Sequence, residues 1–159
     1  GMRIGDVGSG TGLYLAPFSQ AVGENGRVFA IDISPRLIEH IQKRVASEKM
    51  ANVAVVRSTE KSITLPEDSV DRIFICDTYH HFEYHVAMLE SIRSALSPEG
   101  ELIVIDFERI PGKSREWTLN HVRAGKDQVR KEIEAAGFTF VEEVKIPEFS
   151  ENYLLRFRR

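Results

Sequence analysis

Apolar and polar residues along this chain form two kinds of segment in alternation. Short apolar runs with the length of buried strands are separated by longer stretches whose apolar residues recur at helical spacing, as Leu37, Ile41 and Val45 do. The predicted strands cover residues 4–7, 27–33, 52–57, 70–76, 101–107, 138–146 and 152–158. The predicted helices cover residues 13–22, 35–49, 84–96 and 127–136.

Proline and capping residues refine the ends of these helices. Ser34 is expected to cap the second helix, because Pro35 after it is tolerated in the first helical position. Pro17 lies inside the first predicted helix, so we expect a kink or a late start there. Asp127 is expected to cap the last helix. Residues 108–125 are less regular and could form a lid.

The order of the elements predicts the class of fold. Strands and helices alternate as far as residue 137, which implies a parallel sheet with right-handed crossovers. No helix separates the last two strands, so these should pair antiparallel. The chain shows no repeat and no domain boundary, and 159 residues suffice for one core. The sequence therefore predicts an α/β fold in a single domain, residues 1–159.

A glycine-rich stretch follows the first predicted strand. Gly8, Gly10 and Gly12 lack a Cβ, so this backbone can turn tightly and let a ligand approach closely. Thr11 is expected to cap the next helix, whose N-terminus offers free N–H groups. Asp32 ends the second strand, about 20 residues on, where an acid can hold a ribose. These features predict a binding site at the carboxyl ends of the strands.

The run Ile4-Gly5-Asp6-Val7-Gly8-Ser9-Gly10-Thr11-Gly12 resembles motif I of the class I S-adenosylmethionine-dependent methyltransferases. That motif has an apolar pair, Asp or Glu, an apolar residue and then Gly-x-Gly-x-Gly. One departure is Gly5, which stands where the family usually has a large apolar residue. The resemblance implies a Rossmann-like methyltransferase fold with helices on both faces of a mostly parallel seven-stranded sheet. Its strand order would be 3-2-1-4-5-7-6, with strand seven antiparallel.

The resemblance also implies S-adenosylmethionine as the cofactor and S-adenosylhomocysteine as its product. It places the ribose on Asp32 and the adenine against Ile33, while Asp77 and Thr78 would lie near the methyl group. The alternative to cofactor binding is a capping role for Asp6 and for Asp77. For residues 59–60 the alternative is an ordinary surface loop. The implied cofactor-binding residues are Asp6, Gly8, Ser9, Gly10, Thr11, Gly12, Asp32, Ile33, Thr59, Glu60, Asp77 and Thr78.

Two adjacent histidines, His80 and His81, follow the fourth strand and are the candidate catalytic residues. A structural or solvent-facing role is favoured for His80, because adjacent histidines in a loop usually have one. His81 aligns with a histidine common in small-molecule methyltransferases that the chain resembles. Histidine can accept a proton from a nucleophile near neutral pH.

Other polar side chains are expected near the same edge of the sheet. Glu83, His85 and His121 could bind a metal together with the histidine pair, but the spacing matches no standard ligand pattern. No metal site is therefore predicted. Asp106 and Glu108 end the fifth strand, where a solvated or capping role is at least as plausible as a role in the site.

Composition limits the classes of partner and compartment. A net charge of −3 argues against a general nucleic-acid or acidic-membrane binder, and no apolar run suggests a membrane span. The single cysteine, Cys76, cannot form an internal disulfide and is expected to be a buried free thiol. A cytoplasmic protein that binds neither nucleic acid nor a membrane is the resulting expectation.

The family that the chain resembles usually has a helix before the first strand, whereas only three residues precede Ile4 here. We therefore expect that an N-terminal helical segment is lacking. The faces it would cover, including Leu13, Leu15 and Phe18, would then be exposed. A homodimer that covers this apolar surface is the favoured consequence, and folding of residues 108–125 over the opening is the alternative.

Two other classes of function compete with methyl transfer. A nicotinamide-dependent oxidoreductase would need Gly-x-Gly-x-x-Gly, but Leu13 stands at the third glycine position, and no Tyr-x-x-x-Lys pair is present. A non-catalytic domain of methyltransferase fold is not excluded. Among methyltransferases, adenine or glutamine amide methylation is disfavoured because no Asp/Asn-Pro-Pro-aromatic motif follows the fourth strand. A small-molecule acceptor remains the best prediction.

Overall fold

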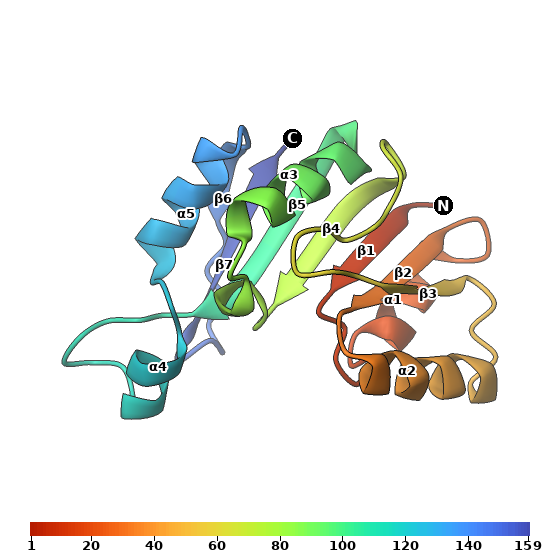
Figure 1. The fold of residues 1–159 in the computed structure, drawn as a ribbon, viewed down its shortest axis with the longest axis horizontal. Coiled ribbons are helices and arrows are strands. Elements are labelled where there is room, and N and C mark those ends of the chain that lie inside the picture. The colour runs from red at the N-terminus through yellow and green to blue at the C-terminus, as the bar shows by residue number, and fades with distance from the viewer.

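One mixed sheet with the strand order β3-β2-β1-β4-β5-β7-β6 organises the computed structural model, which describes residues 1–159 (Figure 1). The strands are β1 (Arg3–Val7), β2 (Arg27–Asp32), β3 (Val53–Arg57), β4 (Val70–Cys76), β5 (Leu96–Phe107), β6 (Thr139–Glu143) and β7 (Asn152–Arg158). The helices are α1 (Leu15–Val22), α2 (Pro35–Ser47), α3 (His85–Ala95), α4 (Glu116–His121) and α5 (Lys126–Ala135), with a 3-10 turn η1 (Tyr79–His81). Only β7 runs antiparallel to its neighbours. The predicted fold class and strand order are confirmed.

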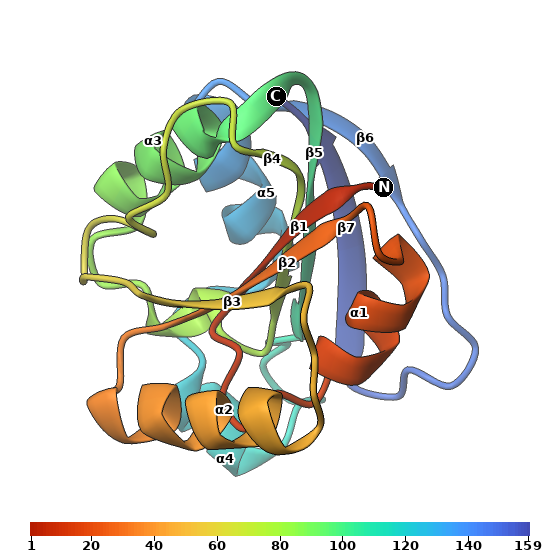
Figure 2. The ribbon, with the colours of Figure 1, turned by 90° about the vertical axis from the view of Figure 1, so that its right-hand side faces the viewer.

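Helices cover the two faces of the sheet through alternate residues of the strands. In β2, Val28 and Ala30 pack against α1 and α2, in a core of 7 buried residues. Ile31 belongs to the other core, whose 22 buried residues also come from α3 and α5. Figure 2 shows α1 on one side of the sheet and α3 and α5 on the other. None of the helices combines the length and the hydrophobicity that crossing a membrane requires.

Several element boundaries differ from the predictions. The first helix starts late, at Leu15, with Tyr14 as its N-cap, so the predicted cap Thr11 is wrong. The cap predicted at Asp127 is also wrong, because Gly125 is the N-cap of α5 and Asp127 lies in its first turn. An acid there still interacts favourably with the helix dipole. Ser34 does cap α2, its side chain accepting a hydrogen bond from the backbone of residue 37.

Three further differences concern the second half of the chain. The strand predicted from residue 101 begins at Leu96, because Leu96 pairs with Val70 before an irregularity in the ladder. Residues 108–125 contain the short helix α4, which lies at the carboxyl edge of the parallel strands (Figure 1). The strand predicted over residues 138–146 is shorter and ends at Glu143.

The apolar surface expected around α1 is smaller than predicted. Leu13 is 70% exposed, but Leu15 is fully buried, so its predicted exposure is wrong. Phe18 is half-buried and packs against the rings of Tyr14 and Phe74. The space beside Gly5 is filled by neighbouring apolar side chains, including that of Ile31. The expected homodimer stays a prediction.

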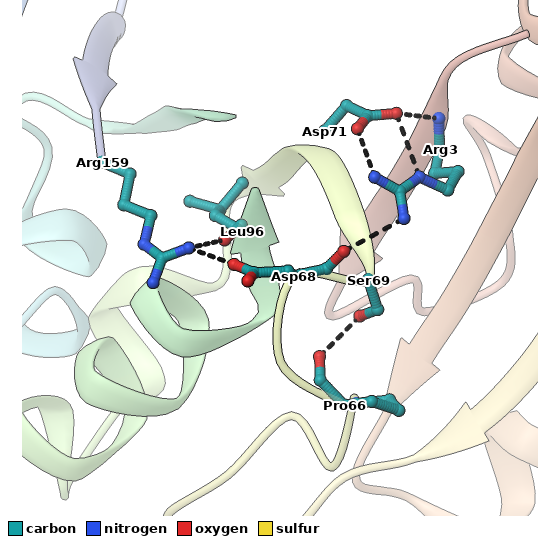
Figure 3. A network of polar contacts seen from close by, with 7 residues as sticks. All are labelled: Arg3, Pro66, Asp68, Ser69, Asp71, Leu96 and Arg159. Carbon is teal, nitrogen blue, oxygen red and sulfur yellow. Dashed lines mark hydrogen bonds and ion pairs between the residues drawn. The ribbon is translucent and has the colours of Figure 1, made fainter. Parts of the chain in front are cut away.

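A polar network ties both ends of the chain to the loop that precedes β4 (Figure 3). The backbone N–H and the guanidinium of Arg3 donate to the carboxylate of Asp71 at 2.8 and 2.6 Å. The same guanidinium donates to the carbonyl of Asp68 at 3.1 Å. Arg159 contacts the Asp68 carboxylate and the carbonyl of Leu96. The network lies where β1 and β4 begin, at the edge opposite the glycine-rich loop.

Candidate active site

The glycine-rich loop leaves β1 with its backbone bonded to the next strand. The N–H groups of Gly8 and Ser9 donate to the carbonyl of Ile31 at 2.8 and 3.0 Å. Gly8 has a φ of 76°, and a Cβ there would lie 2.3 Å from side-chain atoms of Thr78. Gly10 has a φ of 57°, and a Cβ there would meet nothing nearer than 3.9 Å. Gly8 thus lets the loop after β4 approach, whereas Gly10 keeps its own backbone open to a ligand.

Asp32, at the end of β2, holds the loop and the following helix in place. Its Oδ2 accepts a hydrogen bond from Gly10 N and its Oδ1 from Ser34 N, both at 2.9 Å. A carboxylate has about four lone-pair sites, so both oxygens can accept further hydrogen bonds. Asp32 is 6% exposed and borders a cavity, as a ribose-binding acid must.

A cavity of about 590 Å³ opens where these loops meet, within the size range of small-molecule sites. The candidate catalytic residue His81 lines this cavity together with eight residues of the predicted cofactor-binding set, namely residues 8, 10, 32–33, 59–60 and 77–78. Five predicted residues do not line it, namely Asp6, Ser9, Thr11, Gly12 and His80. A smaller cavity of about 360 Å³ lies between the segment after β5 and the β6–β7 connection, away from the glycine-rich loop.

Asp6 and Ser9 lie beneath the loop and not in the cavity. The Ser9 hydroxyl donates to the carbonyl of Asp6 at 2.8 Å and accepts from Ile31 N at 3.2 Å. The Asp6 side chain is 2% exposed, and its Oδ2 has no hydrogen-bond partner in the protein. Burial raises the pKa of Asp6 to about 6, and the nearby negative charge of Asp32 adds to the shift. Thr11 is exposed and Gly12 is buried at the exit of the loop.

The other two loops reach the cavity from β3 and β4. The Thr59 hydroxyl points toward its own loop and accepts a hydrogen bond from Lys61 N at 3.2 Å. Asp77 has a φ of 49°, and its carboxylate accepts from the side chain of Asn152 at 2.8 Å, so Asp77 does not cap a helix. Burial and then the neighbouring Asp106 raise the pKa of Asp77.

Cys76 also differs from its prediction, because its side chain is only partly buried and borders the cavity. Its Sγ lies 3.4 Å from the hydroxyl of Tyr14. Burial raises the pKa of the thiol to about 11, so Cys76 is protonated at neutral pH and is a poor nucleophile.

His80 is buried behind the cavity, where it pairs with Asp106. Its Nδ1 lies 2.7 Å from Asp106 Oδ1, and its backbone N–H donates to Asp106 Oδ2 at 3.0 Å. The structural role favoured for His80 agrees with this burial. Asp106 is 1% exposed, so the solvated role considered for it is wrong.

His81 is exposed and borders the cavity beside His80 and His121. Partial burial, followed by the positive charges that His80 and His121 can carry, lowers the pKa of His81. A neutral imidazole, able to accept a proton, is therefore the favoured form near pH 7. Glu83 lines the cavity, while His85 lies 3.9 Å from Glu132 and apart from the other histidines.

Several residues of the cavity were not predicted from the sequence. Leu37 and Met88 come from the first turns of α2 and α3, so the packing of these helices on the sheet brings them into the site. Their position could have been predicted from the fold, because helices that follow parallel strands begin at the edge of the sheet where ligands bind. The unpredicted lining residues are Ser34, Leu37, Cys76 and Met88. The other lining residues, Val7, Ser58, Phe82 and Glu83, belong to segments that the sequence predicts at this edge.

A glycine-rich loop at the switch point of this sheet, with an acid ending β2, defines a Rossmann-like protein of methyltransferase fold. The family model described as "Methyltransferase domain" matches residues 4–100, and the chain belongs to this family.

Known proteins extend the likeness beyond the family model. The ubiquinone/menaquinone biosynthesis C-methyltransferase UbiE of Proteus mirabilis is 30% identical over 108 residues, which are 67% of this chain and 43% of that protein. The protein of the same name in Shewanella sp. (strain ANA-3) is 29% identical over 110 residues, 69% of this chain and 44% of its own. The chain thus spans less than half the length of these curated relatives.

Solved structures resemble almost the whole chain. A SAM-dependent methyltransferase from Aquifex aeolicus has a TM-score of 0.89 at 27% identity, covering 99% of this chain and 81% of its own. The [4+2]-cyclase SpnF has a TM-score of 0.86 at 14% identity, covering 100% of this chain and 74% of its own. The second likeness concerns the fold alone.

Proposed function

We propose that the protein transfers a methyl group from S-adenosylmethionine to a small-molecule acceptor. The observation that carries the proposal is one cavity bordered by Gly10, Asp32 and His81, in a chain of the methyltransferase-domain family. The first two residues suit the donor, and the third suits an acceptor that must lose a proton.

The residues of the cavity fit this cofactor on three counts. Gly10 leaves open the space that a Cβ would fill, and both Asp32 oxygens can accept ribose hydroxyls. Asp6 lies outside the cavity, so its buried carboxyl can act on the positive end of a bound molecule only through the loop above it. Ile33 and Leu37 offer apolar contact to the adenine. When bound, S-adenosylmethionine supplies a methyl group already activated by its cationic sulfur.

The remaining tasks of the chain are to position the acceptor, exclude water and take up a proton. Residues 76–78 and His81 border the end of the cavity nearest to the histidines. His81 accepts the acceptor's proton on a ring nitrogen, since its lowered pKa keeps the imidazole neutral. Placement of the two reactants contributes most of the rate, on the order of 7–11 kcal/mol in favourable cases.

The names of the curated relatives bear on the methyl acceptor and not on the methyl donor. The curated relatives are C-methyltransferases by name, so carbon acceptors belong in a screen beside oxygen and nitrogen acceptors. A non-catalytic cofactor-binding domain is the second candidate, because the same cavity residues would hold the cofactor without any turnover. Release of S-adenosylhomocysteine during such a screen separates an enzyme from a binding domain.

Calorimetric titration with S-adenosylmethionine tests the donor site. Asp32→Ala should weaken binding by roughly 1–3 kcal/mol, because a hydrogen bond to a charged group is lost. Asp127→Ala is the matched control, since Asp127 is an exposed acid on α5 outside the cavity. Equal affinity in the two variants, or tighter binding of a nicotinamide dinucleotide to the unaltered protein, would contradict the assignment.

A further inference from the structure

Three imidazoles meet beside the cavity although their spacing in the sequence matches no metal motif. His80 and His81 come from η1 after β4, and His121 comes from the end of α4. One ligating nitrogen of each histidine lies within 4.8 Å of those of the other two. We call these three residues the histidine cluster.

One member of the histidine cluster is held in a fixed orientation by a buried carboxylate. The Asp106 carboxylate accepts three hydrogen bonds: from His80 Nδ1 at 2.7 Å, from His80 N at 3.0 Å and from Phe107 N at 2.7 Å. A carboxylate on one ring nitrogen places the proton there and leaves the other nitrogen free to act as a ligand. Metal-binding histidines in proteins are commonly held in this way.

The other two members have ring nitrogens that make no hydrogen bond to the rest of the protein. His81 and His121 are both exposed, so their rings can turn with little effect on the core. Zinc–nitrogen bonds of about 2.0–2.1 Å in a tetrahedron place the ligand nitrogens roughly 3.3 Å apart. Small ring movements from the present separations would reach that geometry.

Aromatic side chains pack beside the histidine cluster. Trp117 stacks on His121 with ring centroids 4.7 Å apart, and Phe107 lies edge-on to Trp117 at 5.4 Å. An apolar shell around imidazole ligands limits solvent access and strengthens electrostatic attraction to a cation. The cluster therefore combines three nitrogen ligands, a supporting carboxylate and adjoining aromatic rings.

We propose that the histidine cluster binds one divalent transition-metal ion of the zinc class through one nitrogen of each imidazole. Imidazole suits zinc, copper, iron and nickel, whereas magnesium and calcium prefer oxygen ligands. Three protein ligands leave at least one coordination position open, as catalytic zinc sites do. Because His81 also borders the cofactor cavity, that position adjoins the acceptor end. A His81 nitrogen that binds the metal no longer accepts the acceptor's proton, so His81 acts as the base only in the metal-free protein. This consequence for the acceptor rests on the proposed methyl transfer, but metal binding itself does not.

The test uses tag-free protein stripped of metal and titrated with Co²⁺, followed by visible absorption, with Zn²⁺ as competitor. We expect one Co²⁺ per chain, displaced by one Zn²⁺. His81→Ala and His121→Ala should each weaken binding by more than about 100-fold, beyond the 10–100-fold typical of a lost supporting residue. His40→Ala and His85→Ala are matched controls, because these histidines lie on α2 and α3 outside the cluster.

Asp106→Asn tests the supporting role separately. It should weaken Co²⁺ binding by about 10–100-fold while the spectrum of the bound ion keeps its form. If this buried variant does not fold, the two exposed histidine variants still decide the question. No stoichiometric Co²⁺ binding by the unaltered protein, or equal losses in the controls, would overturn the proposal. Titration with S-adenosylmethionine in the absence of metal keeps that outcome distinct from failure of the donor site.

Discussion

At the scale of single residues, the buried carboxyl of Asp6 lowers the stability of the folded protein when it is charged. Its carboxyl is buried beneath the glycine-rich loop with one oxygen unpaired, and its pKa is raised from 3.8 to about 6. A raised carboxyl pKa means that the fold disfavours the charged form. Uncompensated groups of this kind concentrate at functional sites, where a ligand can supply the missing partner.

This shift predicts how stability depends on pH. The folded pKa lies above the unfolded one, so the penalty of Asp6 is absent below about pH 4 and complete above pH 6. Asp6→Asn should therefore raise the free energy of unfolding by on the order of 2 kcal/mol at pH 8 and leave it nearly unchanged at pH 4. Urea unfolding at the two pH values measures the difference. Asp127→Asn, an exposed control that removes a charge favourable to the dipole of α5, should show no such gain in stability at pH 8. An Asp6→Asn effect equal at both pH values would refute the assignment.

Residue roles that depend on local spacing could be predicted from the sequence, and those that depend on distant contacts could not. Gly10 and Asp32 follow adjacent strands of a recognisable motif, so their meeting could be expected. The pairing of His80 with Asp106 spans 26 positions and depends on the register of β4 with β5. His121 was considered as a partner of the histidine pair from its residue type, but no pattern in the sequence predicted the helix α4 that brings it there.

At the scale of elements, the loop between β1 and α1 can be tested by a comparison of glycines. Gly10 and Gly23 both have positive φ, 57° and 71°, and neither has a close neighbour that a Cβ would strike. Alanine should lower stability by about 1–2 kcal/mol at Gly10 and by at least as much at Gly23, whose ψ of −172° lies in a region that only glycine readily adopts. Only Gly10→Ala should weaken binding of S-adenosylmethionine, because only Gly10 borders the cavity.

Thermal unfolding and calorimetry of the same two variants separate fold from binding. Gly8→Ala extends the series, since a Cβ there would also strike Thr78 at 2.3 Å and should destabilise the protein more than either. If Gly10→Ala and Gly23→Ala lowered the affinity for S-adenosylmethionine equally, the loop would affect binding only through general stability.

Elements with a strong apolar pattern were predicted best. The strands of the parallel sheet are buried on both faces, so their apolar runs mark them clearly. The helix α4 has six residues with few apolar positions, too short for a periodic pattern to appear. The early start of β5 at Leu96 depends on its pairing with Val70, which local sequence does not contain.

At the scale of the whole molecule, alternation of elements predicted a parallel sheet, while the strand order came from resemblance to a family. Physical rules of handedness and adjacency leave several orders open, so the order itself was not a consequence of pattern. The structure adds what neither source contains, a network that joins β1, the loop before β4 and the end of β7 (Figure 3). This network links the ends of the chain at the edge opposite the site.

The network predicts a pH-dependent contribution to global stability. The hydrogen bond with the Arg3 guanidinium lowers the pKa of Asp71, so its contribution is present above about pH 4 and lost as the pH falls through the folded pKa. Asp71→Ala should lower the free energy of unfolding by about 1 kcal/mol at pH 7, the upper range for a partly exposed pair. In 1 M salt or near pH 2 the difference between variant and unaltered protein should shrink, because the ion pair is screened or protonated.

The exposed Lys43–Glu39 pair on α2 is the matched control, and Glu39→Ala should have a smaller effect at pH 7. An Asp71→Ala effect that persisted unchanged at low pH would show that backbone contacts, and not the charge of Asp71, link β1 to β4.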